Sequence, residues 1–66
     1  MSVLKVLEIL ASSPESWEDA AQKAVTEASK SLRGIQSVNI QNMSAVVKDN
    51  KISEYRVNCK ISFEVE

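Results

Sequence analysis

Within the stretch 52–65, residues 54–65 alternate strictly between polar and apolar side chains, and this pattern constrains the fold more than any other. The apolar members are Tyr55, Val57, Cys59, Ile61, Phe63 and Val65. Because successive side chains of a β-strand point to opposite faces, such alternation is typical of a strand with one buried face. The stretch is therefore predicted to be a strand that turns its apolar side chains toward the core.

A second strand is predicted over 35–48, and a two-residue turn at 49–50 joins the two strands into a hairpin. The turn consists of Asp49 and Asn50. Both residue types tolerate the positive φ that a tight hairpin turn requires. The two strands are therefore expected to be antiparallel neighbours.

The turn also fixes an expected register for the hairpin, with Lys48 opposite Lys51. The pairs that follow are Val38 with Ile61, Ile40 with Cys59, Ser37 with Ser62, Asn39 with Lys60 and Met43 with Arg56. The turn and the hydrophobic pattern favour the same register, which is how register is specified in strands with one buried face. The alternation weakens around 42–44, where a bulge or bend is predicted.

A helix is predicted over 14–33. Ser13 can cap its first turn, Pro14 suits the first helical position, and Gly34 can adopt the left-handed conformation that ends a helix. The apolar stripe consists of Trp17, Ala20, Ala21, Ala24, Val25, Ala28 and Leu32. Because most of these residues are alanine, the helix is expected to lie close against whatever covers it.

A first strand is predicted over 2–11, with apolar residues at both parities. Such a strand is covered on both faces, by the helix and by a second subunit, or else leaves one apolar face exposed. The pattern does not decide which hairpin strand it joins or which face meets the helix. The predicted fold class is α+β: a single domain over 1–66 with β-α-β-β order, in which a three-stranded antiparallel sheet wraps over one helix.

The length and composition favour an oligomer. A chain of 66 residues buries a small core, and this one has a single cysteine and no histidine, so neither an internal disulfide nor a structural zinc site supports it.

The net charge of −1 and the scattered charges give no basic patch for nucleic acid or a membrane surface. No leader-like or membrane-spanning segment is recognised, so a cytoplasmic location is predicted.

Enzyme motifs are absent, because no histidine can act as a base and one glycine cannot form a phosphate-binding loop. Cys59 is interpreted as a buried structural thiol rather than a nucleophile, and Trp17 as a core residue rather than a stacking platform. The polar sheet face has no aromatic side chain, which argues against single-stranded RNA. Arg56 and Lys60 could meet an anion, although an ion pair is the more ordinary reading. The acidic residues that could bind a cation, or remain solvated, are Glu54, Glu64 and Glu66.

The whole chain resembles the dodecin family. The resemblance rests on KVLEILASSPESWEDAAQKAV (5–25), SLRGI (31–35) and ISEYRVNCKISFEVE (52–66), together with the predicted element order. It implies a non-enzymatic protein that assembles as a hollow homododecamer. It also implies paired riboflavin or FMN at subunit interfaces, for storage, with coenzyme A or metal ions such as calcium in some members.

The resemblance also shows two departures at the flavin site. Ser37 stands where flavin-binding members have a tryptophan that stacks on the flavin, and Arg56 stands where they have a glutamine. Flavin binding is therefore expected to be weak or absent, and the leading hypothesis is a shell that binds another small ligand or a cation. Two alternatives stay open: flavin storage through a modified pocket, and a purely structural assembly. The residues of a metal site are not specified by the sequence.

Overall fold

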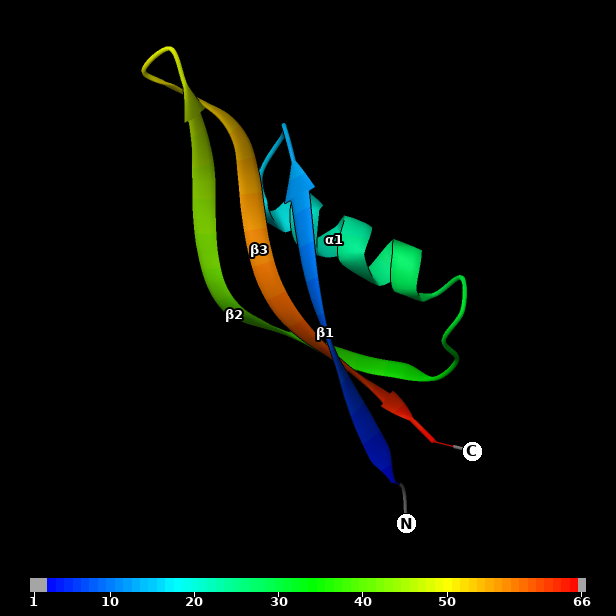
Figure 1. Ribbon diagram of the computed structural model, residues 1–66. Coiled ribbons are helices and arrows are strands. Elements are labelled where there is room, and N and C mark those ends of the chain that lie inside the picture. Colours follow the sequence, from blue (N-terminus) through cyan, green and yellow to red (C-terminus); the bar gives the residue numbers. More distant parts are fainter. Residues whose placement is uncertain (1–2, 66) are drawn as a thin grey trace.

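The computed structural model describes residues 3–65 and has one helix and three strands (Figure 1). The elements are β1 (Leu4–Ser13), α1 (Trp17–Ala28), β2 (Ile35–Lys48) and β3 (Lys51–Glu64). The strands form one antiparallel sheet, and α1 lies against one face of it. The predicted α+β class and β-α-β-β order are confirmed.

β3 is the central strand, because the sheet order is β1-β3-β2. This order answers the question that the sequence pattern left open, since β1 joins β3 and lies away from β2. β3 also carries the larger side chains of the core: Val57, Cys59 and Ile61 are 1%, 0% and 0% exposed. The strict alternation of its sequence thus reflects a strand that has a neighbour on each side and a helix over one face.

The hairpin turn is as predicted, with Asp49 at φ 52° and Asn50 at φ 62°. Two positive φ values in succession define the turn whose twist matches that of the flanking strands. Lys48 pairs with Lys51 as expected. The expected pairs between residues 37–40 and residues 59–62 also form: Ser37 with Ser62, Val38 with Ile61, Asn39 with Lys60 and Ile40 with Cys59. The strand predicted over 52–65 is observed at Lys51–Glu64, so both of its ends lie one residue earlier than predicted.

The middle of the hairpin differs from the predicted register. Met43 pairs with Val57, and Arg56 pairs with Ser44 instead. The reason is a pair of compensating irregularities, one next to Ser53 in β3 and one next to Gln41 in β2. Each adds one unpaired residue to one strand, so the register shifts by one between them and then returns. The bulge expected around 42–44 therefore lies at Gln41, slightly earlier in β2.

The helix is shorter at its start than predicted, because Ser16 rather than Ser13 is the N-cap. Ser16 is extended, at φ −170° and ψ 167°, and its hydroxyl accepts the backbone N–H of Asp19 at 2.9 Å. Ser13 is instead the last residue of β1, and its hydroxyl accepts the backbone N–H of Glu15 at 2.9 Å. Pro14 thus lies in the connection between strand and helix.

The helix also ends earlier than predicted, at Ala28 rather than residue 33. Beyond it the backbone continues in tight turns, with Lys30 N–H donating to Glu27 O and Ser31 N–H to Ala28 O. Gly34 does have positive φ, at 68°, but it introduces β2. A Cβ on Gly34 would lie 3.3 Å from the Cβ of Glu64, so a glycine is also favoured there by close approach to β3.

β1 runs over Leu4–Ser13 rather than the predicted 2–11, and residue 2 lies outside the described residues. It extends to Ser13 because that residue still pairs with Tyr55 of β3. Ile9 and Ala11 share the helix-covered face and pack against the core. The other face of β1 carries Leu4, Val6 and Leu10, which are exposed in a single chain.

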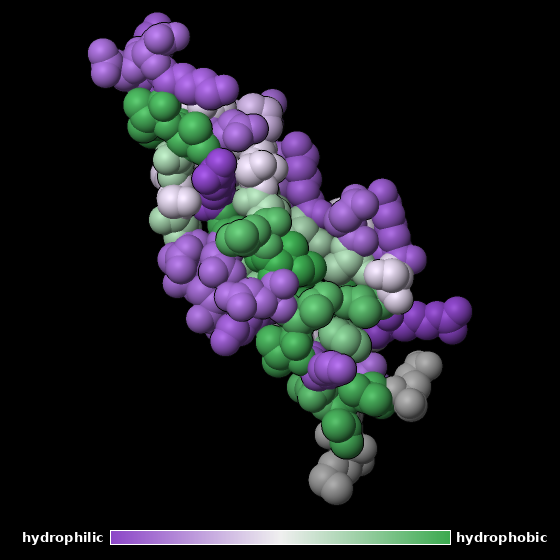
Figure 2. All heavy atoms as spheres, viewed as in Figure 1, coloured by the Kyte–Doolittle hydropathy of each residue, from purple (hydrophilic) through white to green (hydrophobic). Residues whose placement is uncertain are grey.

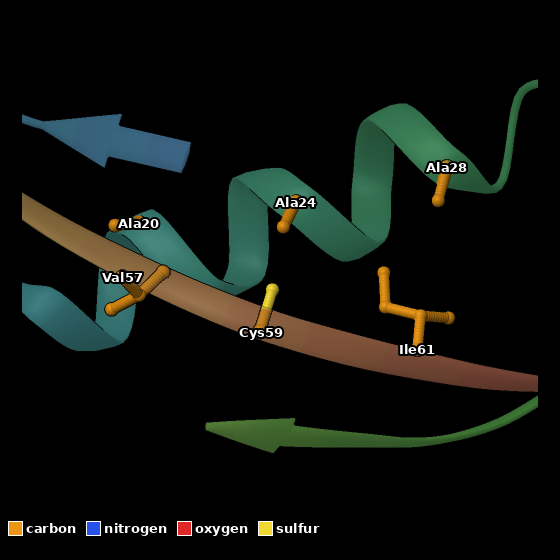
Figure 3. Packing of buried hydrophobic residues seen from close by; sticks show 6 residues of the cluster. All are labelled: Ala20, Ala24, Ala28, Val57, Cys59 and Ile61. Carbon is orange, nitrogen blue, oxygen red and sulfur yellow. The ribbon is translucent and has the colours of Figure 1, made fainter. Parts of the chain in front are cut away.

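The core is built from small residues on α1 and larger residues on β3 (Figure 3). Ala20, Ala24 and Ala28 of the helix point toward Val57, Cys59 and Ile61 of the strand. The absence of bulk on the helix lets its backbone approach the sheet closely. The alanine stripe that the sequence showed is therefore the contact surface of α1.

A polar network closes the β1–α1 connection. Ser13 is 1% exposed, and its hydroxyl donates to an Asp19 carboxylate oxygen at 2.5 Å. This hydrogen bond, opposed by desolvation and assisted by Lys23 at 3.3 Å, lowers the pKa of Asp19 below its ordinary value of 3.8. The ionised carboxylate is thus the form that the folded chain favours.

Acid is expected to weaken the fold in part through this network. A carboxyl group whose pKa is lower in the folded than in the unfolded chain stabilises the fold above its unfolded pKa, and the contribution is lost as the pH falls through the folded value. Ser13→Ala should therefore flatten the decline of stability between about pH 5 and pH 2. Urea unfolding at a series of pH values measures this, with Ser12→Ala as the control on the exposed side of the same strand. Parallel pH curves for wild type and Ser13→Ala would contradict the assigned role of the hydroxyl.

Candidate functional site

The face of the sheet opposite α1 carries no covering element in the described chain (Figure 1), and we call it the open face. Directly opposed residues of antiparallel strands point to the same side, so the register identifies its members. They are Leu4, Val6, Glu8, Leu10 and Ser12 of β1, Glu54, Arg56, Asn58, Lys60, Ser62 and Glu64 of β3, and Ser37, Asn39, Asn42, Ser44 and Val46 of β2. Ser37 and Arg56, the two candidate site residues from the sequence, both lie on it.

A hollow of about 440 Å³ lies on the open face around the middle of β3, and we call it the open-face pocket. It is lined by Leu10, Ala11, Ser12, Asn42, Ser44, Arg56, Val57 and Asn58. All three strands contribute, since β3 forms its floor and the two edge strands its sides. A volume of this size is within the range of small-molecule sites.

Arg56 occupies one cross-strand row of this pocket, between Ser12 of β1 and Ser44 of β2. Within the described residues the ion pairs are Lys23 with Asp19 and Lys30 with Glu27, so Arg56 has no carboxylate partner there. A guanidinium donates hydrogen bonds and accepts none. The row therefore presents donors and a positive charge to the pocket.

Asn58 occupies the next row, between Leu10 and Asn42. Its Oδ1 atom is buried and has no hydrogen-bond donor among the described residues. A buried acceptor without a donor costs roughly 1–3 kcal/mol. The centre of the pocket thus holds an unsatisfied amide.

Ser37 lies at the other end of the open face, outside the pocket. Its hydroxyl shares a hydrogen bond of 2.5 Å with that of Ser62, its partner on β3. Ser62 is six residues beyond Arg56 along β3, which corresponds to about 20 Å in a strand. One chain therefore does not bring Ser37 and Arg56 together, and a site that used both would combine two copies.

Among residues 3–65, the acidic candidates are not gathered into a metal site within one chain. Glu54 lies on the open face opposite Val46, Glu64 lies near the far end of β3, and Glu66 is outside the described residues. Over residues 3–65 no group of three or more carboxylates or thiols lies together. Calcium takes about six to eight oxygen ligands, more than Glu54 or Glu64 alone supplies.

Trp17 and Cys59 have the structural roles that the sequence indicated. Trp17 packs against the core, meets the Tyr55 ring edge-on with centroids 4.8 Å apart, and donates its indole N–H to the Ser44 carbonyl at 2.9 Å. Cys59 is fully buried, and desolvation raises its pKa, which disfavours the reactive thiolate. Neither side chain is placed to contact a ligand on the open face.

The sequence reasoning missed the pocket residues that flank Arg56 from the edge strands. Leu10 and Ser12 join the site because β1 pairs with β3, and the sequence left that pairing open. Asn42 and Ser44 join it because the shifted register turns them toward the open face.

No helix in the described part of the chain has the length and apolar character of a membrane span.

The fold and the pocket define a small sheet-and-helix protein with a ligand-sized hollow on its uncovered sheet face. The chain belongs to the dodecin family, whose family model matches residues 3–66. A curated relative from Mycobacterium tuberculosis, named calcium dodecin, is 35% identical over 65 residues, which cover 98% of this chain and 92% of the relative.

Solved dodecin structures have the same fold. The dodecin from Streptomyces coelicolor has a TM-score of 0.94 at 26% identity, with 98% of this chain and 93% of that chain covered. The crystal structure of calcium dodecin from M. tuberculosis, described as having a novel calcium-binding site, has a TM-score of 0.85 at 36% identity, with 98% and 93% covered. The family resemblance seen in the sequence is thus confirmed.

Proposed function

We propose that this chain forms a non-enzymatic homododecameric shell that binds a small ligand or a cation, and that its flavin binding is weak or absent. The observation that carries the proposal is the open face, which combines a ligand-sized pocket with exposed apolar side chains and no aromatic residue. A cytoplasmic location, self-association as the main protein contact, and the absence of nucleic-acid or membrane partners belong to the same proposal.

The exposed apolar residues support self-assembly. On the open face of β1, Leu4, Val6 and Leu10 are 51%, 54% and 77% exposed. Figure 2 shows apolar side chains gathered on the visible surface, including the region around the start of β1. Neighbouring apolar side chains left in water mark interaction surfaces, and a chain this short gains most by covering them with further copies. Membership of the dodecin family supports twelve copies in a closed shell.

The replacement at Ser37 supports weakened flavin binding. The hydroxyl of Ser37 is engaged with Ser62, and no aromatic ring on the open face stands in for a stacking tryptophan. Stacking on an aromatic side chain is worth ~1–3 kcal/mol for a nucleobase, and a flavin ring should be comparable. The loss of two symmetry-related tryptophans would thus weaken binding by roughly two to four orders of magnitude.

The similarity to a protein named calcium dodecin supports a cation as one of the ligands. Since one chain gathers no set of carboxylates over residues 3–65, the ion would lie where several copies meet. Glu54 and Glu64 are candidates for such a shared site because both lie on the open face. Coenzyme A remains a further candidate ligand.

Flavin storage through a modified pocket is the second candidate function. The volume of the open-face pocket favours it, because about 440 Å³ is enough for a small planar molecule beside Arg56. It predicts a yellow protein, or one that takes up flavin on refolding. A purely structural assembly predicts a shell that holds neither an organic ligand nor a metal.

Native mass spectrometry of the purified protein, followed by titration calorimetry with CaCl₂ and with FMN, tests the proposal. We expect the mass of twelve chains, an excess mass from a bound ligand or calcium, and FMN affinity weaker than about micromolar, a free energy of about −8 kcal/mol. A monomer or dimer would contradict the shell. Submicromolar FMN binding would contradict the loss of the flavin site.

A further inference from the structure

The part of the hairpin between its two compensating irregularities consists of residues 42–46 of β2 opposite 54–58 of β3. We infer that this part of β2 is a conformational switch, which slides by one residue along β3. It moves between the observed register and the register set by the turn, in which Met43 pairs with Arg56. The inference goes beyond the proposed function and does not depend on which ligand the chain binds.

The two irregularities can cancel each other. Gln41 is the extra residue of β2, and Ser53 is the extra residue of β3. On both sides of them, over 37–40 and 47–48, the pairs already follow the register set by the turn. A slide of residues 42–46 by one position absorbs both extra residues, so β2 becomes regular from Ser37 to Lys48. Because each extra residue interrupts the ladder of backbone hydrogen bonds, the slide restores pairing that the irregularities cost.

The side chains of this segment do little to fix its register. Met43 is 60% exposed, Asn42 and Ser44 are exposed, and Ala45 and Val46 are half-buried. Each face of the segment carries both polar and apolar groups or is left largely in water, so neither is a clear core face. Register is strongly specified where one face of a strand is buried and weakly where it is not. Side-chain packing therefore discriminates little between the two registers.

Two side-chain hydrogen bonds belong to the observed register. The indole N–H of Trp17 donates to the Ser44 carbonyl at 2.9 Å, and the hydroxyl of Ser53 donates to the Val46 carbonyl at 3.2 Å. The slide moves Ser44 by about 3.3 Å along β3, which breaks its bond with Trp17. A hydrogen bond at the surface exchanges with water at a small net cost. The bonds that are lost and the ladder pairing that is regained thus offset each other.

The slide exchanges the faces of the segment. A shift of one residue turns every side chain of a strand to the other face. In the observed register Asn42 and Ser44 lie on the open face, and in the slipped register Met43 and Ala45 replace them. The edge of the open face then offers a thioether and a methyl group in place of an amide and a hydroxyl. A molecule that contacts this edge meets different groups in the two registers and therefore shifts their populations.

Disulfide trapping in the assembled full-length protein tests the inference. Met43→Cys with Arg56→Cys places two thiols on one face only in the slipped register, and Ser44→Cys with Arg56→Cys does so only in the observed register. Cysteines whose side chains point apart are not bridged. In glutathione buffer we expect both pairs to close, the slipped pair with an equilibrium constant about 10- to 1,000-fold lower, the range for a minor conformer. No closure of the slipped pair would overturn the inference.

A deletion supplies the matched control. Removing Gln41 and Ser53 together leaves residues 42–46 opposite 54–58 in a regular ladder, so a slide would create two irregularities instead of removing two. In this background the observed pair should still close, and closure of the slipped pair should fall by about tenfold or more. Native mass spectrometry verifies that the deletion variant assembles. Equal closure of the slipped pair in both backgrounds would contradict a slide between the two extra residues.

The single tryptophan gives a test on the unmodified protein. Trp17 is the only tryptophan of the chain, and its indole N–H reaches Ser44 only in the observed register. NMR relaxation dispersion should show exchange in the microsecond-to-millisecond range, or a second set of signals, at this N–H and at the amides of 42–46. The amides of 38–40, which pair alike in both registers, are the internal control. An unexchanging single signal at Trp17 and throughout 42–46 would overturn the switch, even if a cysteine pair closes.

Discussion

Ala24→Leu is expected to lower the free energy of unfolding by about 2–3 kcal/mol, because extra methylenes in a well-packed core force neighbouring atoms to move. Ala24 is 2% exposed and points at Cys59 on the central strand (Figure 3). The helix approaches the sheet closely only because its inner residues are small. A leucine would have to push α1 away from β3 along much of its length.

Urea unfolding followed by circular dichroism, at one fixed protein concentration, measures this loss. Gln22→Leu is the matched control, since it places the same side chain on an exposed position of the same helix. It should change the stability by no more than about 0.5 kcal/mol. Equal destabilisation by the two substitutions would mean that helix surface chemistry, and not core packing, sets the effect.

Ser37→Trp is expected to raise the affinity for riboflavin by roughly two to four orders of magnitude, if two symmetry-related copies supply one ring each. The physical reason is the stacking surface that the serine lacks. Ser37 is exposed on the open face, so a larger side chain can be placed there without disturbing the core. The hydrogen bond that is lost with Ser62 lies at the surface and contributes little.

Quenching of riboflavin fluorescence measures the affinity of wild type and variant. Ser37→Leu serves as the control, because it adds apolar bulk at the same position without an aromatic ring. The tryptophan variant should quench far more strongly than the leucine variant. An affinity unchanged by tryptophan would show that the flavin site of the family is not inherited at this position.

Much of the fold follows from local patterns in the sequence. The strict alternation of β3, the Asp49-Asn50 turn and the alanine stripe each report one dominant physical effect, and all three were interpreted correctly. The pairing of β1 was not predictable in the same way. Both faces of β1 are apolar, so the period that identifies a buried face carries no information there.

The helix ends were misplaced because several residues offered the same signal. Ser13 and Ser16 are both good caps, and the choice between them depends on tertiary structure: Ser13 is held in β1 by its pairing with Tyr55. At the other end, Gly34 has the positive φ that ends many helices, yet its position beside Glu64 determines that conformation. The local sequence determines which conformations and caps a residue can provide. Contacts with distant residues determine which of the possible positions begins or ends the helix.

The face on which the candidate site residues lie was predictable from the sequence, but the pocket around them was not. Ser37 and Arg56 were assigned to one face from the hairpin register alone, and the structure places both there. The pocket around Arg56, however, depends on β1 and on the two irregularities that shift residues 42–46 by one position. The residue pattern indicated the first of these irregularities near 42–44, one position or more from its place at Gln41, and gave no sign of the second beside Ser53.

The position of β3 at the centre of the sheet also constrains when this protein can fold. β3 is the last of the four elements to be synthesised, yet β1 and β2 pair only with it, and the alanine face of α1 packs on its side chains. The register of β1 runs from Leu4–Glu64 to Ser13–Tyr55, so every pair between β1 and β3 joins residues far apart in the sequence. Until β3 has emerged from the ribosome, β1 and β2 have no strand with which to pair. The sheet of this chain therefore cannot assemble before β3 has been synthesised.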